Sequence, residues 1–99
     1  MVVIKVHDTY RKVVAICDSE LVGKKFEQDN LELDINDKFY GGKEYSDEKA
    51  LEMIKWAITE DACFNFVGKN SVELGVKAGI IDRDSILTVQ GISHALSLM

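Results

Sequence analysis

The chain of 99 residues contains no proline and only two cysteines. Without proline, turn geometry must come from glycine, asparagine and aspartate. Two cysteines without zinc-type spacing argue against a disulfide framework and a metal site, and they fit a reducing compartment. No apolar run approaches the roughly 20 residues that span a bilayer, and the N-terminus lacks a signal-peptide pattern. We therefore expect a cytoplasmic protein with no metal, no cofactor and no membrane contact.

Positive charge is also scarce. The formal net charge is −5, and the acidic excess falls in residues 31–99. This charge opposes strong non-specific binding to nucleic acid. A local basic surface would still form if the fold gathered Arg11, Lys12, Lys24 and Lys25. The alternative is that these four are solvated side chains at strand ends.

The 46% hydrophobic content is that of a globular protein, and we expect residues 1–99 to form one domain. Ser46 is a candidate N-cap for a long helix with apolar residues at three- and four-residue spacing. Asn70 is a candidate cap for a second, shorter helix that ends near Gly79. Apolar or alternating runs predict strands over residues 2–7, 12–17, 31–35, 64–67 and 86–89. This order predicts an α+β two-layer sandwich, with a mainly antiparallel sheet of about five strands covered by two helices.

An aromatic-glycine segment, Phe39-Tyr40-Gly41-Gly42, precedes the long helix. Adjacent glycines allow another surface to approach the backbone closely. We interpret the segment as an exposed loop that binds a partner, with Tyr40 free to stack on a base. The alternative is that Phe39 and Tyr40 close the core and that the glycines only make a turn.

Cys17, supported by Asp18 and His94, is a candidate catalytic nucleophile. The alternative is a buried structural Cys17 with His94 packed or exposed elsewhere. Cys63 is expected in the core. Trp56 falls off the apolar stripe of the long helix; we expect it to pack in the core, and the alternative is a position at a partner surface. None of the cysteines and histidines has metal-ligand spacing.

The segment Val67-Gly68-Lys69-Asn70-Ser71 lies between a predicted strand and a predicted helix, as a phosphate-binding loop does. Cys63 stands where that motif needs its first glycine, which excludes a nucleoside triphosphate site. An anion at the helix N-terminus remains possible on this pattern.

Several short motifs occur in a fixed order along the chain: Cys17-Asp18, Leu21-Val22-Gly23-Lys24, Phe26, Phe39-Tyr40-Gly41-Gly42, Asn65-Phe66-Val67-Gly68 and Gly91-Ile92-Ser93-His94-Ala95. This ordered set resembles the archaeal family known as domain of unknown function 424, over nearly the whole chain. Ser93 and Leu96 replace the proline and glutamine that are usual there. The resemblance implies a small cytoplasmic α/β sandwich without established enzymatic activity, and an association with translation or RNA.

Three hypotheses follow. The first is a binding module for RNA or a ribonucleoprotein, in which Tyr40 stacks on a base and the four basic side chains contact phosphates. The second is a small enzyme that uses Cys17. The third is a scaffold subunit that contacts only protein, which the acidic residues 31–99 favour. We expect binding rather than catalysis, and the sequence leaves the oligomeric state and the role of residues 91–99 open.

Overall fold

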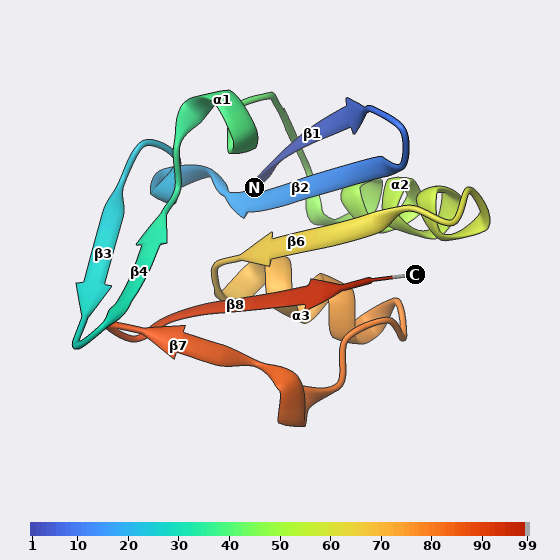
Figure 1. The fold of residues 1–99 in the computed structure, drawn as a ribbon. Coiled ribbons are helices and arrows are strands. Elements are labelled where there is room, and N and C mark those ends of the chain that lie inside the picture. Colours follow the sequence, from blue (N-terminus) through green and yellow to red (C-terminus); the bar gives the residue numbers. More distant parts are fainter. Residues whose placement is uncertain (99) are drawn as a thin grey trace.

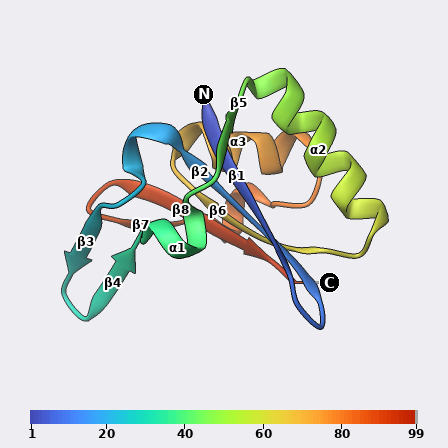
Figure 2. The same cartoon turned by 90° about the horizontal axis from the view of Figure 1, so that it is seen from above.

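A six-stranded sheet forms the centre of the molecule in a computed structural model that describes residues 1–98. The strand order is β5-β1-β2-β6-β8-β7; Figure 1 labels the strands from β1 to β7 in this order, and Figure 2 also labels β5. Strands β2 and β6 are parallel, and the other neighbours are antiparallel. The six strands are β1 (Val2–Asp8), β2 (Lys12–Asp18), β5 (Lys43–Tyr45), β6 (Cys63–Val67), β7 (Leu87–Val89) and β8 (Ile92–Ser97).

Helices α2 (Asp47–Thr59) and α3 (Lys69–Lys77) cover one face of this sheet, behind the strands in Figure 1. The Oγ atom of Ser46 accepts a hydrogen bond from the backbone N–H of Lys49 at 3.2 Å, so the predicted N-cap is confirmed. The helices bury their apolar sides against alternate residues of the central strands. The principal core residues of this layer are Ile4, Ile16, Ala50, Ile54, Ala57, Phe64, Phe66, Val72 and Leu74.

The opposite face of the sheet is covered only in part. The covering elements are the short helix α1 (Asp37–Tyr40), the 3-10 turn η1 (Ser19–Leu21) and a separate hairpin of β3 (Lys25–Gln28) and β4 (Leu31–Asp34). Figures 1 and 2 show the hairpin reaching beyond the body of the sheet. Gln90 holds it, because its backbone N–H donates to Gln28 Oε1 at 2.7 Å and its side-chain amide donates to the Glu27 carbonyl.

The expected α+β class is confirmed, and the sheet has six strands rather than about five. The predictions missed β3, whose side chains are mostly exposed, and β5, which is only three residues long. The ambiguous tail contains β8, a strand inside the sheet, and its last residue, Met99, lies outside the described residues. Helix α3 begins one residue before Asn70, with Gly68 at the cap position, so the predicted Asn70 cap is wrong.

The radius of gyration, 12.4 Å, matches the roughly 13 Å of a compact chain of about 100 residues. Within residues 1–98, every helix is too short or too polar to cross a membrane.

Candidate functional site

The expected anion site at the start of α3 is filled by a side chain of the protein. Asp18, at the end of β2, is only 3% exposed. Its Oδ1 atom accepts hydrogen bonds from the N–H and the hydroxyl of Ser71, both at 2.8 Å, and its Oδ2 atom accepts one from the N–H of Asn70 at 3.1 Å. These are the donors that an external anion would need. Asp18 therefore joins β2 to α3, and the first turn of α3 is not an open site.

Cys17 lies in an environment that suppresses nucleophilic reactivity. Its side chain is fully buried, and the thiol donates to the carbonyl of Asp18 at 3.2 Å. Burial, with the charges of Asp18 and Glu20, raises the pKa of the thiol to about 12. A catalytic thiol needs a lowered pKa and access to solvent. The described structure provides neither at Cys17.

His94 does not activate this thiol. Cys17 is opposite Val67, and Val67 is opposite His94, so two strand spacings of about 4.8 Å each separate the cysteine from the histidine. Burial also lowers the pKa of His94, which keeps its ring neutral at pH 7. A neutral ring on a residue whose backbone lies about 10 Å away does not supply the adjacent cation that lowers the pKa of a catalytic thiol. The candidate residues Cys17, Asp18 and His94 therefore do not form a catalytic group.

The predicted exposed aromatic loop is instead a helical turn that packs on the sheet. Tyr40 is 8% exposed within the second core cluster, and burial raises its pKa to about 12. Phe39 stacks on His7 with ring centroids 4.6 Å apart, and it meets the edge of Tyr40 at 4.9 Å. His7 Nε2 also lies 2.8 Å from the carbonyl oxygen of Phe39. The interpretation of Tyr40 as an exposed base-stacking residue is wrong, because its ring closes the core.

Gly41 and Gly42 allow segments of this chain to approach one another. A Cβ atom at Gly41 would overlap the Asp37 carboxylate, and one at Gly42 would overlap the carbonyl oxygen of Ile4. Neither glycine has a positive φ. The close approach that these glycines allow in this structure is therefore between segments of the same chain: Gly41 lies against Asp37, and Gly42 lies against β1.

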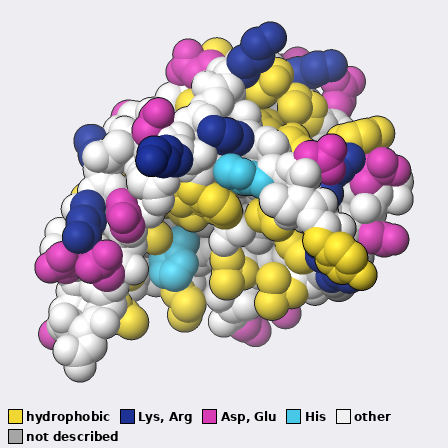
Figure 3. All heavy atoms as spheres, turned by 45° about the horizontal axis from the view of Figure 1, so that its top comes forward, with side chains coloured by type: hydrophobic (Ala, Val, Ile, Leu, Met, Phe, Trp, Pro, Cys, Tyr) yellow, Lys and Arg dark blue, Asp and Glu magenta, His cyan; other side chains and the backbone are white. Residues whose placement is uncertain are grey.

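The four basic residues do not gather into one surface. Arg11 and Lys12 lie at the start of β2, whereas Lys24 and Lys25 follow its far end. The seven residues of β2 span about 20 Å. The Nζ atom of Lys25 also lies 3.7 Å from Glu27 Oε1 and 3.6 Å from Glu32 Oε1. Figure 3 shows basic side chains scattered among acidic ones on the face where both histidines are visible.

Two exposed aromatic side chains lie near the Thr9–Lys12 turn, between β1 and β2. Tyr10 is fully exposed, and Trp56, on α2, is 53% exposed rather than in the core. The Nζ atom of Lys12 lies 4.9 Å from the centroid of the Trp56 ring and 3.9 Å from Glu60 Oε1. The sequence contained a signal for Tyr10, an aromatic residue that lies between the predicted strands 2–7 and 12–17 and directly precedes Arg11. The sequence also contained a signal for the exposure of Trp56, which lies outside the apolar stripe of α2.

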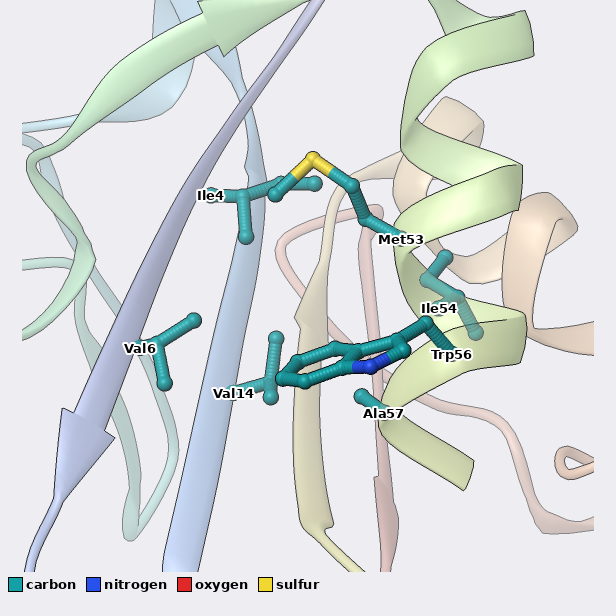
Figure 4. A pocket seen from close by; sticks show the side chains of 7 residues that line it. All are labelled: Ile4, Val6, Val14, Met53, Ile54, Trp56 and Ala57. Carbon is teal, nitrogen blue, oxygen red and sulfur yellow. The ribbon is translucent and has the colours of Figure 1, made fainter. Parts of the chain in front are cut away.

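A small apolar pocket opens between α2 and β1. Figure 4 shows the indole of Trp56 extending from the helix toward Val6 and Val14. The empty volume is about 230 Å³, including the open mouth. Its lining is entirely apolar: Ile4, Val6, Val14, Met53, Ile54, Trp56 and Ala57.

No metal centre is evident in the described part of the chain. Among residues 1–98, no three histidine, cysteine, aspartate or glutamate side chains are grouped to hold an ion. Cys63 is buried, as expected, and its sulfur lies 3.9 Å from Arg11 Nη1.

These features define a small α+β domain in which three exposed side chains, Val6, Tyr10 and Trp56, lie near the end of β1 and the start of β2. Residues 6–98 match the family described as protein of unknown function (DUF424), and the chain belongs to that family. The expected family is thereby confirmed. The chain is also similar to the crystal structure of an uncharacterized conserved protein from Methanopyrus kandleri, at 28% identity and a TM-score of 0.86. The match covers 96% of this chain and 88% of that chain. No curated protein matches the chain.

Proposed function

We propose that the protein is a cytoplasmic binding module that contacts single-stranded RNA through the Thr9–Lys12 turn. The observation that carries this proposal is the fully exposed ring of Tyr10, which is followed directly by two cationic residues, Arg11 and Lys12. An exposed aromatic ring can stack on a base, which contributes about 1–3 kcal/mol per base, while cationic side chains contact phosphates. The proposal keeps Arg11 and Lys12 from the sequence analysis as the phosphate contacts, and it replaces Tyr40 with Tyr10 as the residue that stacks on a base.

The charge of the protein favours a single strand over a duplex as the partner. At a net charge of −5, phosphate contacts alone give little attraction. Unpaired bases add stacking energy that a duplex does not offer to Tyr10. Trp56 is less suited to this role, because Lys12 lies over its ring and its side chain lines the pocket.

The proposed compartment agrees with the cysteines, which are both free. Cys63 is opposite Val13, and Val13 is four residues from Cys17 along β2. Cys17 and Cys63 are therefore offset by about 13 Å along the strand direction, which is too far for a disulfide between them. An association with translation remains part of the proposal, and contact with RNA is the property that would support it.

The test is fluorescence anisotropy of a labelled, mixed-sequence single-stranded RNA, titrated with the protein at increasing salt. We expect log K to fall linearly with log salt, with a slope of about −0.7 for each phosphate contact. Tyr10→Ala should weaken binding by about 5- to 150-fold, whereas Tyr10→Phe should retain it. Arg11→Gln should make the slope less steep by about 0.7.

The matched control is the double variant Lys24→Gln, Lys25→Gln, which removes two cationic side chains at the far end of β2. It should bind RNA as the parent protein does. Absence of binding at low salt would overturn the proposal. An equal loss of affinity in the control would also overturn it, because the contact would then be non-specific.

A further inference from the structure

The outer half of β1 is an open strand edge. Strand β5 pairs with Val2, Val3 and Ile4 only, although β1 continues to Asp8. Within residues 1–98, no strand lies along the outer side of residues 5–8. The pairing of β1 with β2 is continuous and has no bulge, so residues 5–8 remain regular. An edge of this kind presents unpaired backbone N–H and C=O groups that another extended chain can bind.

The apolar pocket adjoins this edge on the helix side of the sheet. Val6 belongs to the open segment, is 42% exposed and lines the pocket with Ile4, Met53 and Trp56. Side chains alternate between the two faces of a strand. A strand added beside β1 would therefore place every second side chain on the same face as Val6, next to the pocket mouth.

The other face of the added strand would meet positive charge. Lys5 lies on the face opposite Val6, because side chains alternate along β1. Lys43, on β5, lies opposite Ile4, so its side chain is on the pocket face with Ile4 and Val6 and adds no charge beside Lys5. Among the described residues, Lys5 takes part in no ion pair. An acidic residue directly before or after the apolar residue of the added strand would therefore lie beside Lys5 and favour binding.

We propose that the open edge of β1 and the adjoining pocket bind an extended peptide of a partner protein, with an apolar side chain in the pocket and a neighbouring acidic side chain beside Lys5. Backbone hydrogen bonds supply affinity in this mode, and the pocket supplies specificity. This site adjoins the RNA contact at Lys12, whose Nζ atom lies 4.9 Å from the Trp56 ring, but Tyr10 and Arg11 do not line the pocket and belong to the RNA contact alone.

A second copy of the chain fits the edge less well. Symmetric antiparallel pairing centred on Val6 would place Lys5 opposite His7 and would bring no carboxylate to Lys5. The open edge also has only four residues, from 5 to 8, whereas a stable interface buries about 800 Å² on each partner.

The probe is the synthetic peptide Thr-Val-Glu-Leu-Glu-Val-Thr, blocked at both ends. Trp56 is the only tryptophan and lines the pocket, so its fluorescence reports directly on the site. We expect a saturable shift of its emission to shorter wavelength as the peptide displaces water from the indole. Replacement of the central leucine by alanine should weaken binding at least about tenfold, and N-methylation of the peptide backbone should abolish it.

Protein variants test the same site from the other side. Val6→Asp should abolish the shift, whereas Leu87→Asp, on the opposite edge strand β7, should leave it unchanged. Lys5→Glu should reverse the charge preference, so that a peptide with lysine in place of both glutamates binds better. Tyr10→Ala should weaken RNA binding and leave peptide binding intact, which separates the two proposals.

Three results would overturn the inference. The first is the absence of a saturable shift with the parent peptide. The second is equal binding of the N-methylated peptide, which would show that no strand is added. The third is a concentration-dependent dimer, without peptide, that Val6→Asp dissociates, which would show that a second copy occupies the edge.

Discussion

The carboxylate of Asp18 lies against the backbone of Gly68, so closely that a Cβ atom at Gly68 would overlap it. Gly68 has a φ of 102°, which favours glycine, and it directly precedes the turn of α3 whose N–H groups Asp18 binds. The contact brings the end of β2 to the start of α3, which follows it by about fifty residues.

Replacement of Gly68 by alanine should therefore strongly destabilise the protein. We expect a loss of at least about 2 kcal/mol in the free energy of unfolding, from backbone strain and overlap with Asp18 together. Gly79→Ala is the matched control, because Gly79 also has a positive φ, 83°, but has open space around it. Its cost should be about 1 kcal/mol. Urea unfolding measures the free energy lost in each variant, and equal losses in the two would contradict the importance of the Asp18 contact.

The thiol of Cys17 should resist alkylation in the folded protein. Its burial and its raised pKa, about 12, leave almost no accessible thiolate at pH 8. Iodoacetamide labelling of Cys63→Ala, in which Cys17 is the remaining thiol, should be slow in buffer and fast in urea. Rapid labelling of the folded protein would reinstate Cys17 as a reactive group.

Stability should fall at alkaline pH. Burial raises the pKa of Cys17 from 9.0 to about 12 and that of Tyr40 from 10.0 to about 12. Both groups then ionise in the unfolded chain before they ionise in the folded protein. The free energy of unfolding should be insensitive to these groups below about pH 9 and should decline from there to about pH 12, by up to about 1.4 kcal/mol per pH unit for each group. Urea unfolding midpoints measured across this pH range test the prediction. In Tyr40→Phe, the free energy of unfolding should decline less steeply above about pH 10.

Tyr40→Ala and Tyr10→Ala should have opposite effects. Removal of the buried Tyr40 ring should cost about 3–5 kcal/mol of stability, as loss of a large aromatic core residue does. Tyr10→Ala should change stability by no more than about 0.5 kcal/mol, because the side chain is fully exposed, and should weaken RNA binding. Thermal melting and RNA titration of the two variants give the comparison. A stable Tyr40→Ala variant with weakened RNA binding would restore the sequence interpretation of this residue.

The elements that the sequence predicted well are those whose cause is local. Helix α2 follows from its apolar spacing and from Ser46, whose hydroxyl caps a residue three positions away. Strands β1 and β2 follow from their β-branched residues and the turn between them. Strand β5 was missed because three residues carry too little pattern, and β8 was missed because its place in the sheet depends on β6 and β7.

The candidate site depended more on contacts between distant residues. From the sequence, Asp18 is a candidate support for Cys17, yet its partners in the structure are Asn70 and Ser71. The glycines after Tyr40 indicate close approach correctly, but only the fold shows that Ile4 is what approaches Gly42. The separation of Arg11 from Lys25 likewise depends on the extended path of β2, which residue types alone do not fix.

The position of β8 also sets an order of assembly during protein synthesis. Strand β7 leaves the ribosome before β8, yet it is joined to the sheet only through β8. Until β8 has formed, β7 has only its contacts with the β3–β4 hairpin, and one edge of β6 has no strand beside it. During that interval β6, which carries Phe64 and Phe66, presents an unpaired strand edge, and such edges make incompletely folded chains prone to associate.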